Sequence, residues 1–153
     1  MRNHTILMGL ALTLSLMISM AFVLANTNKV IEAHVWIHPQ RLTIDEHEWP
    51  LHSPWVTAFI QLPKNYSARN IDPASITLQV NGGTVQASNR HAILGRIYVA
   101  KFDRAEVNDL LRTLIGHMMP HPMQKVTLVI MGNLRDGTIF RGEDTINVFF
   151  EDN

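Results

Sequence analysis

The chain of 153 residues contains no cysteine, so it has no disulfide bonds to stabilise it and no thiol nucleophile. It also lacks an excess of charge of either sign, with 13 Lys and Arg residues against 13 Asp and Glu residues. Without a basic excess to neutralise phosphates, nucleic-acid binding is not expected. Beyond residue 25 there is no second long apolar run, which argues against any further membrane-spanning helix.

The first 25 residues have the layout of an export signal. Arg2 precedes an uncharged apolar run from Ile6 to Ala25, which ends in small residues. The same run, at about 20 residues, is long enough to span a bilayer as a helix. We therefore interpret residues 1–25 as a signal peptide or an N-terminal membrane anchor. Residues 26–29 then form a spacer, and residues 30–153 form one exported domain in the periplasm, outside the cell or at its surface.

Apolar and polar residues alternate along several short segments of this domain, which is typical of half-buried β-strands. In residues 75–80, for example, Ile76, Leu78 and Val80 share one face of the predicted strand. The alternation is clearest in residues 55–62, 75–80, 125–132 and 144–150, and further candidate strands are residues 30–37, 41–44, 84–88 and 97–102.

Turn residues and one change of period complete the fold prediction. Asn81-Gly82-Gly83 and Asp136-Gly137 predict hairpin turns, because these residues accept a positive φ. In residues 103–115 the apolar period becomes helical, and Asp103 and Glu106 have the spacing of a capping box. We predict an all-β, two-sheet antiparallel β-sandwich with one short helix at about residues 103–115.

Three stretches together resemble a known module. WVTAFIQLPKNYSARNIDPASITL (55–78), VAKFDRAEV (99–107) and VTLVIMGNLRDGTIFRGEDTINV (126–148) are similar to an Ig-like β-sandwich module of exported archaeal and bacterial proteins. The resemblance covers roughly residues 36–150 and implies an Ig-like fold, an extracytoplasmic location and no catalytic residues. Members of this family usually carry an Asp-rich run before the KFDR strand. Residues 88–96 (SNRHAILGR) contain no carboxylate here, so a calcium site is not carried over.

The segment GHMMPHPM (116–123) is the strongest candidate for a metal site. Thioether sulfur favours copper(I), and imidazole suits copper and zinc. His117, Met119, His121 and Met123 are the predicted ligands, with His34, His38 or His91 brought near by the fold. The alternative is an ordinary connecting loop with Met side chains that fill gaps under the helix.

Tryptophan residues offer a second kind of site. Trp49, between Glu48 and Pro50, is the candidate for an exposed anchor that binds a protein partner or stacks on a sugar. Trp36 and Trp55 are predicted to be core residues of paired strands. His34 and His38 are four residues apart, so on a strand they share a face but lie about 13 Å apart.

We therefore expect a non-enzymatic exported β-sandwich module that binds or assembles with extracytoplasmic or cell-surface components, including further copies of itself. No cofactor is expected for this function, and contact with the membrane arises only through residues 1–25 if they are retained. The alternative is a periplasmic or extracellular protein that binds copper or zinc through residues 116–123. A carbohydrate-binding module that uses Trp49 is a third hypothesis.

Overall fold

The computed structural model describes residues 29–44, 53–115 and 123–150, and the predicted signal or anchor segment lies outside these ranges. None of the helical segments in the described ranges has the length and apolar character needed to cross a membrane. The elements in chain order are β1 (Val30–Glu32), β2 (His34–His38), β3 (Arg41–Ile44), β4 (Trp55–Gln61), the 3₁₀ turns η1 (Ala68–Asn70) and η2 (Pro73–Ser75), β5 (Thr77–Val80), β6 (Gly83–Gln86), β7 (His91–Leu94), β8 (Ile97–Asp103), α2 (Arg104–Ile115), β9 (Met123–Asn133) and β10 (Ile139–Phe150).

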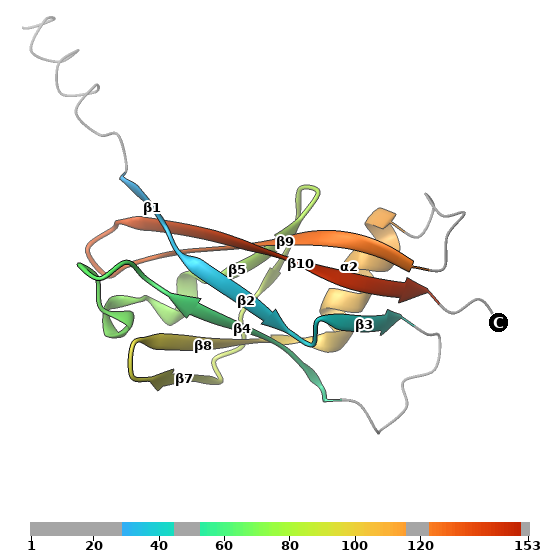
Figure 1. Cartoon of the computed structure of the whole chain (residues 1–153), viewed down its shortest axis with the longest axis horizontal. Helices are drawn as coiled ribbons and strands as arrows, with labels where there is room; N and C mark the ends of the chain where they lie inside the picture. Colours follow the sequence, from blue (N-terminus) through green and yellow to red (C-terminus); the bar gives the residue numbers. More distant parts are fainter. Residues whose placement is uncertain (1–28, 45–52, 116–122, 151–153) are drawn as a thin grey trace, which may run out of the picture.

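These strands form two sheets that lie one above the other (Figure 1). The first is a six-stranded sheet in the order β1-β10-β9-β5-β6, with β3 also paired to β10. The second is a four-stranded sheet in the order β2-β4-β8-β7. The predicted all-β class with two sheets and a short helix is thus confirmed for the described part of the chain.

The core lies between the sheets and comes from the alternating residues. Val56, Ala58 and Ile60 of β4 are completely buried, and Leu78 of β5 and Ile130 of β9 meet them from the other sheet's inner face. Since burying one Leu, Ile or Val side chain contributes about 1.5–3 kcal/mol, this layer supplies the main driving force for folding in a chain without disulfides.

Two of the β-hairpins match the predicted turns. Asn81 and Gly82 have φ values of 44° and 87°, and their flanking residues Val80 and Gly83 pair across the hairpin. Gly83 serves a different purpose from the one predicted, because it begins β6 and a Cβ there would collide with Leu110 of α2. At the second hairpin Gly137 has a φ of 86°.

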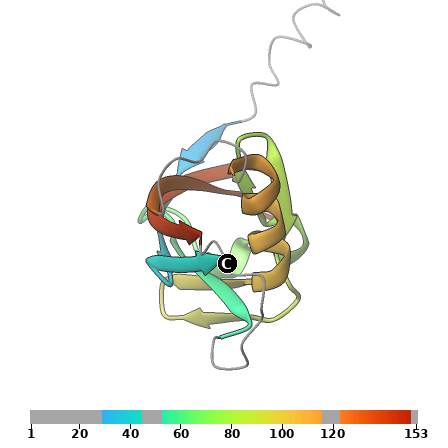
Figure 2. The same ribbon diagram turned by 90° about the vertical axis from the view of Figure 1, so that its right-hand side faces the viewer.

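The α2 helix lies at one side of the two sheets and bridges the space between them (Figure 2). Its residues Val107 and Leu111 are completely buried. The Asp103 carboxylate caps the helix by accepting hydrogen bonds from the backbone N–H groups of Ala105 and Glu106, at 2.9 and 3.4 Å. In the described part of the chain the Glu106 side chain makes no return bond to Asp103, so only this half of the predicted capping box is present.

Two strand pairings depart from the predicted antiparallel arrangement, which dominates both sheets. β1 and β3 both pair with β10 in parallel, whereas β2, between them in the chain, pairs with β4 in the other sheet. The chain therefore crosses between the sheets twice within residues 30–44. The predicted strand at residues 30–37 is divided at Ala33, where the first crossing occurs.

Candidate functional site

Most residues that the sequence analysis selected for binding lie outside the described residues. These are Trp49, His117, Met119 and His121, so the copper or zinc site and the Trp49 anchor stay predictions. Met123 is described: it begins β9 and its side chain is 48% exposed. Within residues 29–44, 53–115 and 123–150 no group of three or more His, Asp or Glu side chains is arranged to hold a metal ion.

The other histidines do not converge. His34 and His38 share the exposed face of β2, as predicted from their spacing. His91 lies on β7, and β2 and β7 form the two opposite edges of the four-stranded sheet. The prediction that one of them lies near the 116–123 segment stays a prediction, because residues 116–122 are outside the described residues.

The prediction that Trp36 and Trp55 are core residues was wrong. Both are only partly buried, and neither belongs to the core cluster. The reason is that successive side chains of a strand point to opposite faces of the sheet. Val35 and Ile37 point into the core, so Trp36, between them, points to the outer face. The burial of Val56 places Trp55 on the outer face for the same reason.

An apolar row crosses this outer face of the four-stranded sheet. The strand register places Trp36, Phe59, Val99 and Ala92 opposite one another on β2, β4, β8 and β7. The rings of Trp36 and Phe59 are stacked, with centroids 5.3 Å apart and an angle of 6° between their planes. The row ends at β7, so apolar surface on the sheet face is continuous with the edge of the sheet.

The strand β7 was not predicted, and all four of its residues are exposed. Ile93 is 40% and Leu94 is 59% exposed, which is high for large apolar side chains in a strand. Among the described residues no strand pairs with its outer side, and it lies below β8 at the lower left in Figure 1. A signal was available in the sequence: the apolar run Ala92-Ile93-Leu94 is followed by Gly95, which has a φ of 62° in the turn to β8.

The backbone groups of β7 divide between β8 and the open side. Leu94 pairs with Ile97 across the two-residue turn, and Ala92 pairs with Val99 two residues further on. Because hydrogen-bonded and non-hydrogen-bonded pairs alternate along an antiparallel ladder, Leu94 and Ala92 direct their N–H and C=O groups to β8. The N–H and C=O groups of His91 and Ile93 therefore face outward, along an edge to which another strand can bind.

Positive charge surrounds this edge. The Arg90 guanidinium carbon and the Lys101 nitrogen lie 5.6 and 5.9 Å from the centre of the Trp55 ring. Arg96 is exposed in the turn after β7. Among the described residues the ion pairs are Asp109–Arg112 and Glu143–Arg141, so none of the three cations Arg90, Arg96 and Lys101 has a carboxylate partner there.

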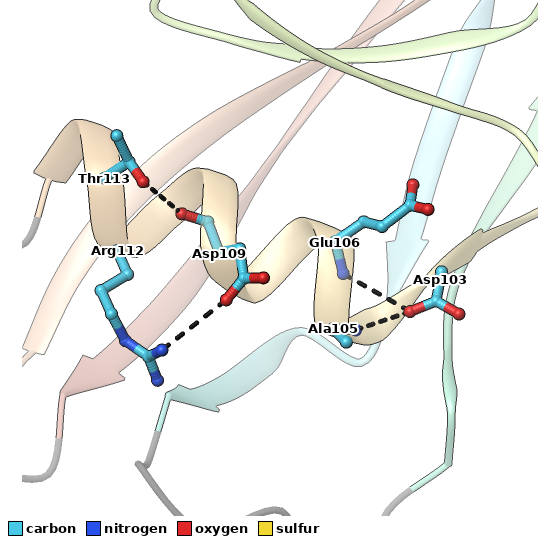
Figure 3. Close-up of polar contacts among 6 residues, drawn as sticks. All are labelled: Asp103, Ala105, Glu106, Asp109, Arg112 and Thr113. Carbon is cyan, nitrogen blue, oxygen red and sulfur yellow. Dashed lines mark hydrogen bonds and ion pairs between the residues drawn. The ribbon is translucent and has the colours of Figure 1, made fainter.

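A shallow cleft of about 320 Å³ lies beside the Trp55 ring, at the end of the sheet where β7 begins. Its lining includes two carboxylates, those of Asp103 and Glu106, together with the Trp55 ring near which Arg90 and Lys101 lie. Figure 3 shows that the Asp103 carboxylate is already engaged as the cap of α2. The charge near the Trp55 ring is thus mixed, whereas Arg96, in the turn after β7, has no carboxylate partner among the described residues.

The side of β7 that faces the core contacts Tyr98. The His91 and Tyr98 rings are stacked, with centroids 5.4 Å apart. The Tyr98 hydroxyl is buried and has no hydrogen-bond partner among the described residues. Burial, with a smaller contribution from the negative charge of Asp72, raises the pKa of Tyr98 to about 12. This phenol is therefore a neutral group beneath the open edge rather than an acid or base near pH 7.

Comparison with protein-family models, curated proteins and solved structures gave no match for this chain.

Proposed function

We propose that this protein is an exported, non-enzymatic, Ig-like β-sandwich module that binds or assembles with extracytoplasmic or cell-surface proteins through the open edge at β7. A single observation carries this proposal: β7 is an exposed apolar strand whose outward backbone groups have no partner strand in the described part of the chain. An open edge of this kind is a template to which another chain can add a strand.

The strand order supports the Ig-like assignment. Immunoglobulin-type sandwiches place strands A, B, E and D in one sheet and G, F and C in the other. Naming β2 as A and β4 as B gives the order A-B-E-D for the sheet β2-β4-β8-β7. The order β10-β9-β5-β6 then corresponds to G-F-C-C′, and β7 is the edge strand D.

The way in which two other edges, at β2 and β6, are covered supports a role for β7 in binding. On β2 the backbone N–H of Ile37 donates to the Asp144 carboxylate at 2.7 Å, and β10 runs alongside. At β6 the α2 helix packs against Gly83. Proteins normally protect exposed edges with charge, proline, a bulge or a cover, and β7 itself has neither a formal charge, with histidine neutral, nor a proline.

A site-specific cross-linking experiment in the producing cells tests this proposal. A photoreactive residue is placed at Leu94 on β7 or, as the matched control, at His38 on β2, the opposite edge of the same sheet. Each is combined with Ile93→Pro, which removes an outward N–H while leaving the pairing of β7 with β8 intact. Ala92→Pro is the contrasting variant, because it removes an N–H that bonds to β8 and should destabilise the fold.

We expect a discrete adduct from Leu94 that Ile93→Pro abolishes, and no such adduct from His38. An adduct with the mass of two copies would identify self-assembly as the form that the function takes. Equal labelling from both positions, or an adduct that survives Ile93→Pro, would contradict strand addition at β7.

The export part of the proposal has its own test. Intact-mass measurement of the protein recovered from the cell envelope or medium distinguishes cleavage near Ala25 from retention of residues 1–25. Recovery of the chain in the cytoplasm alone, with an intact N-terminus, would contradict export.

A further inference from the structure

We infer that the edge at β7 is built for one class of partner: an extended segment with apolar residues at its centre and an acidic residue at each end. The inference rests on the proposed function, since it assumes that β7 accepts a strand, and it adds the chemistry that the strand should have. Three features of the edge support it: the distribution of charge, the alternation of side chains along β7 and the positions of Arg90, Arg96 and Lys101.

The charge distribution around β7 is one-sided over a long stretch of sequence. From Pro73 to Phe102 the chain contains no Asp or Glu, yet this stretch includes Arg90, Arg96 and Lys101. It forms β5, β6, β7 and most of β8, so the acid-free region contains the whole open edge. The first carboxylate after it is that of Asp103, which caps α2.

The alternation of side chains arranges these groups in a pattern that a partner strand can match. Arg90, Ala92 and Leu94 point to the outer face of the sheet, and Arg96 follows in the turn. Directly opposed residues of neighbouring strands share a face, so the partner needs an acid opposite Arg90 and apolar residues opposite Ala92 and Leu94. A second acid is needed near Arg96, and the pattern reads the same in either direction of the strand.

The Trp55 ring holds the Arg90 side chain in place on this outer face. The guanidinium lies 5.6 Å from the ring centre, and the backbone N–H of Arg90 donates to the Ser88 hydroxyl at 3.3 Å. A cation held against an aromatic ring loses less conformational freedom when it pairs with a carboxylate. This arrangement favours an anionic group at the start of β7 even though Asp103 and Glu106 lie nearby.

A second copy of the chain fits this edge less well. If two β7 strands paired in an antiparallel arrangement, the cations of both copies would lie along the same pair of strands. Arg90 of one copy would then lie near Arg96 of the other. Like charges at neighbouring positions of paired strands are destabilising, and neither β7 supplies a carboxylate to balance them. Self-pairing is therefore an outcome that the experiment must be able to detect.

The test uses the full-length chain and three capped synthetic peptides that differ only at their ends. The sequences are ETVTVTE, QTVTVTQ and KTVTVTK, in one-letter code, and binding is measured by titration at low and at high salt. Two exposed ion pairs contribute about 0.2–1 kcal/mol each, so the Glu peptide should bind about two- to thirtyfold more tightly than the Gln peptide. The Lys peptide should bind more weakly than both, and high salt should remove the differences.

Amide signals locate the peptide on the protein. The N–H groups of His91 and Ile93 should become protected from hydrogen exchange when the Glu peptide binds, whereas those of Ala92 and Leu94 are already bonded to β8 and should change little. This readout separates strand addition from a non-specific attraction between opposite charges.

Charge reversal at Arg96, which has no carboxylate partner among the described residues, gives the sharpest variant. Arg96→Glu should abolish the preference for the Glu peptide and bring the Lys peptide to at least equal affinity. Arg135→Glu, at an exposed arginine of the β9–β10 hairpin, changes the net charge equally and should leave the preference unchanged.

The outcomes distinguish the two proposals. If all three peptides bind equally and protect His91 and Ile93, strand addition stands and the acidic class of partner is overturned. If none binds and the chain stays monomeric in sedimentation, both proposals fail. If none binds and the chain forms a dimer that Ile93→Pro abolishes, the partner is a second copy and the acidic class is again overturned.

Discussion

The two edge strands of the four-stranded sheet, β2 and β7, carry the same kinds of backbone groups, but only the edge at β2 is covered by other residues in the described part of the chain. At β2 the N–H of Ala33, just before the strand, donates to the Arg141 carbonyl at 2.8 Å, and Ile37 donates to the Asp144 carboxylate at 2.7 Å. At β7 the outward groups of His91 and Ile93 meet no other strand within residues 29–44, 53–115 and 123–150. The difference shows that an edge strand of this sheet is closed only where β10 of the other sheet reaches it.

Two residues of β10 make that closure possible. Asp144 accepts hydrogen bonds from Ile37 and from the Gln40 side chain with one carboxylate oxygen, and from its own neighbour Thr145 with the other. Gly142 allows the close approach, since a Cβ there would lie 2.5 Å from both the Ala33 carbonyl oxygen and Val35 Cγ2. The predicted strand at residues 144–150 begins at Asp144, and no local pattern in the sequence assigns a contact to Gly142.

The largest effect should come from Gly142→Ala, which forces β10 away from the closed edge. The new Cβ would collide with backbone as well as with a buried side chain, so we expect a loss of about 3 kcal/mol in the free energy of unfolding. Urea denaturation followed by circular dichroism measures it. Glu143→Ala, one residue along the same strand and exposed, is the control, and a loss below 1 kcal/mol for Gly142→Ala would contradict the close contact.

Asp144→Ala should be next in size. It leaves the Ile37 N–H without its acceptor at the sheet edge, and a hydrogen bond to a charged group contributes about 1.5–3 kcal/mol. We expect a loss of about 2 kcal/mol in the free energy of unfolding. Asp144→Asn keeps an acceptor oxygen and should lose less, so equal losses in the two variants would show that the hydrogen bond is not the cause.

Tyr98→Phe concerns the side of the sheet beneath the open edge. Because the pKa of Tyr98 in the folded chain is raised from 10.0 to about 12, the phenol resists ionisation after folding. The stability of the native state should therefore be unaffected below pH 10 and should fall as the pH rises towards 12. Removing the hydroxyl should flatten this fall and, since the hydroxyl has no partner among the described residues, should cost less than about 1 kcal/mol at pH 7. Identical pH profiles for the variant and the parent between pH 10 and 12 would contradict the assignment.

The smallest effect on folding should come from the open edge itself. Leu94→Lys changes a side chain that is 59% exposed and has no strand beyond it, so the free energy of unfolding should change by less than about 0.5 kcal/mol. Binding of the Glu peptide should nevertheless change, which separates a role in binding from a role in stability. A loss of folding stability comparable to that of Asp144→Ala would mean that β7 belongs to the structural core.

Much of the fold was predictable, because alternation and turn chemistry are local. Val56, Ala58 and Ile60 are buried as their spacing predicted, and the Asn81-Gly82 turn and the Asp103 cap form where expected. The same alternation places Trp55, next to the buried Val56, on the outer face. The prediction that Trp55 is a core residue followed instead from the general preference of tryptophan for burial. The candidate site was harder to predict, because β7 is short and has no polar alternation, so its residues do not show the pattern of a half-buried strand.

The sequence alone determined which face is buried in the alternating strands, where the Asn81-Gly82 and Asp136-Gly137 hairpins turn and where the helix begins, because each of these depends on residues within a few positions of one another. Only the tertiary structure decided which edges are closed. The bond that closes β2 joins Ile37 to Asp144, which are 107 residues apart, and no local pattern encodes that meeting. The open edge at β7 has the same origin, since it is open because β10 lies beside β2 at the opposite side of the sheet.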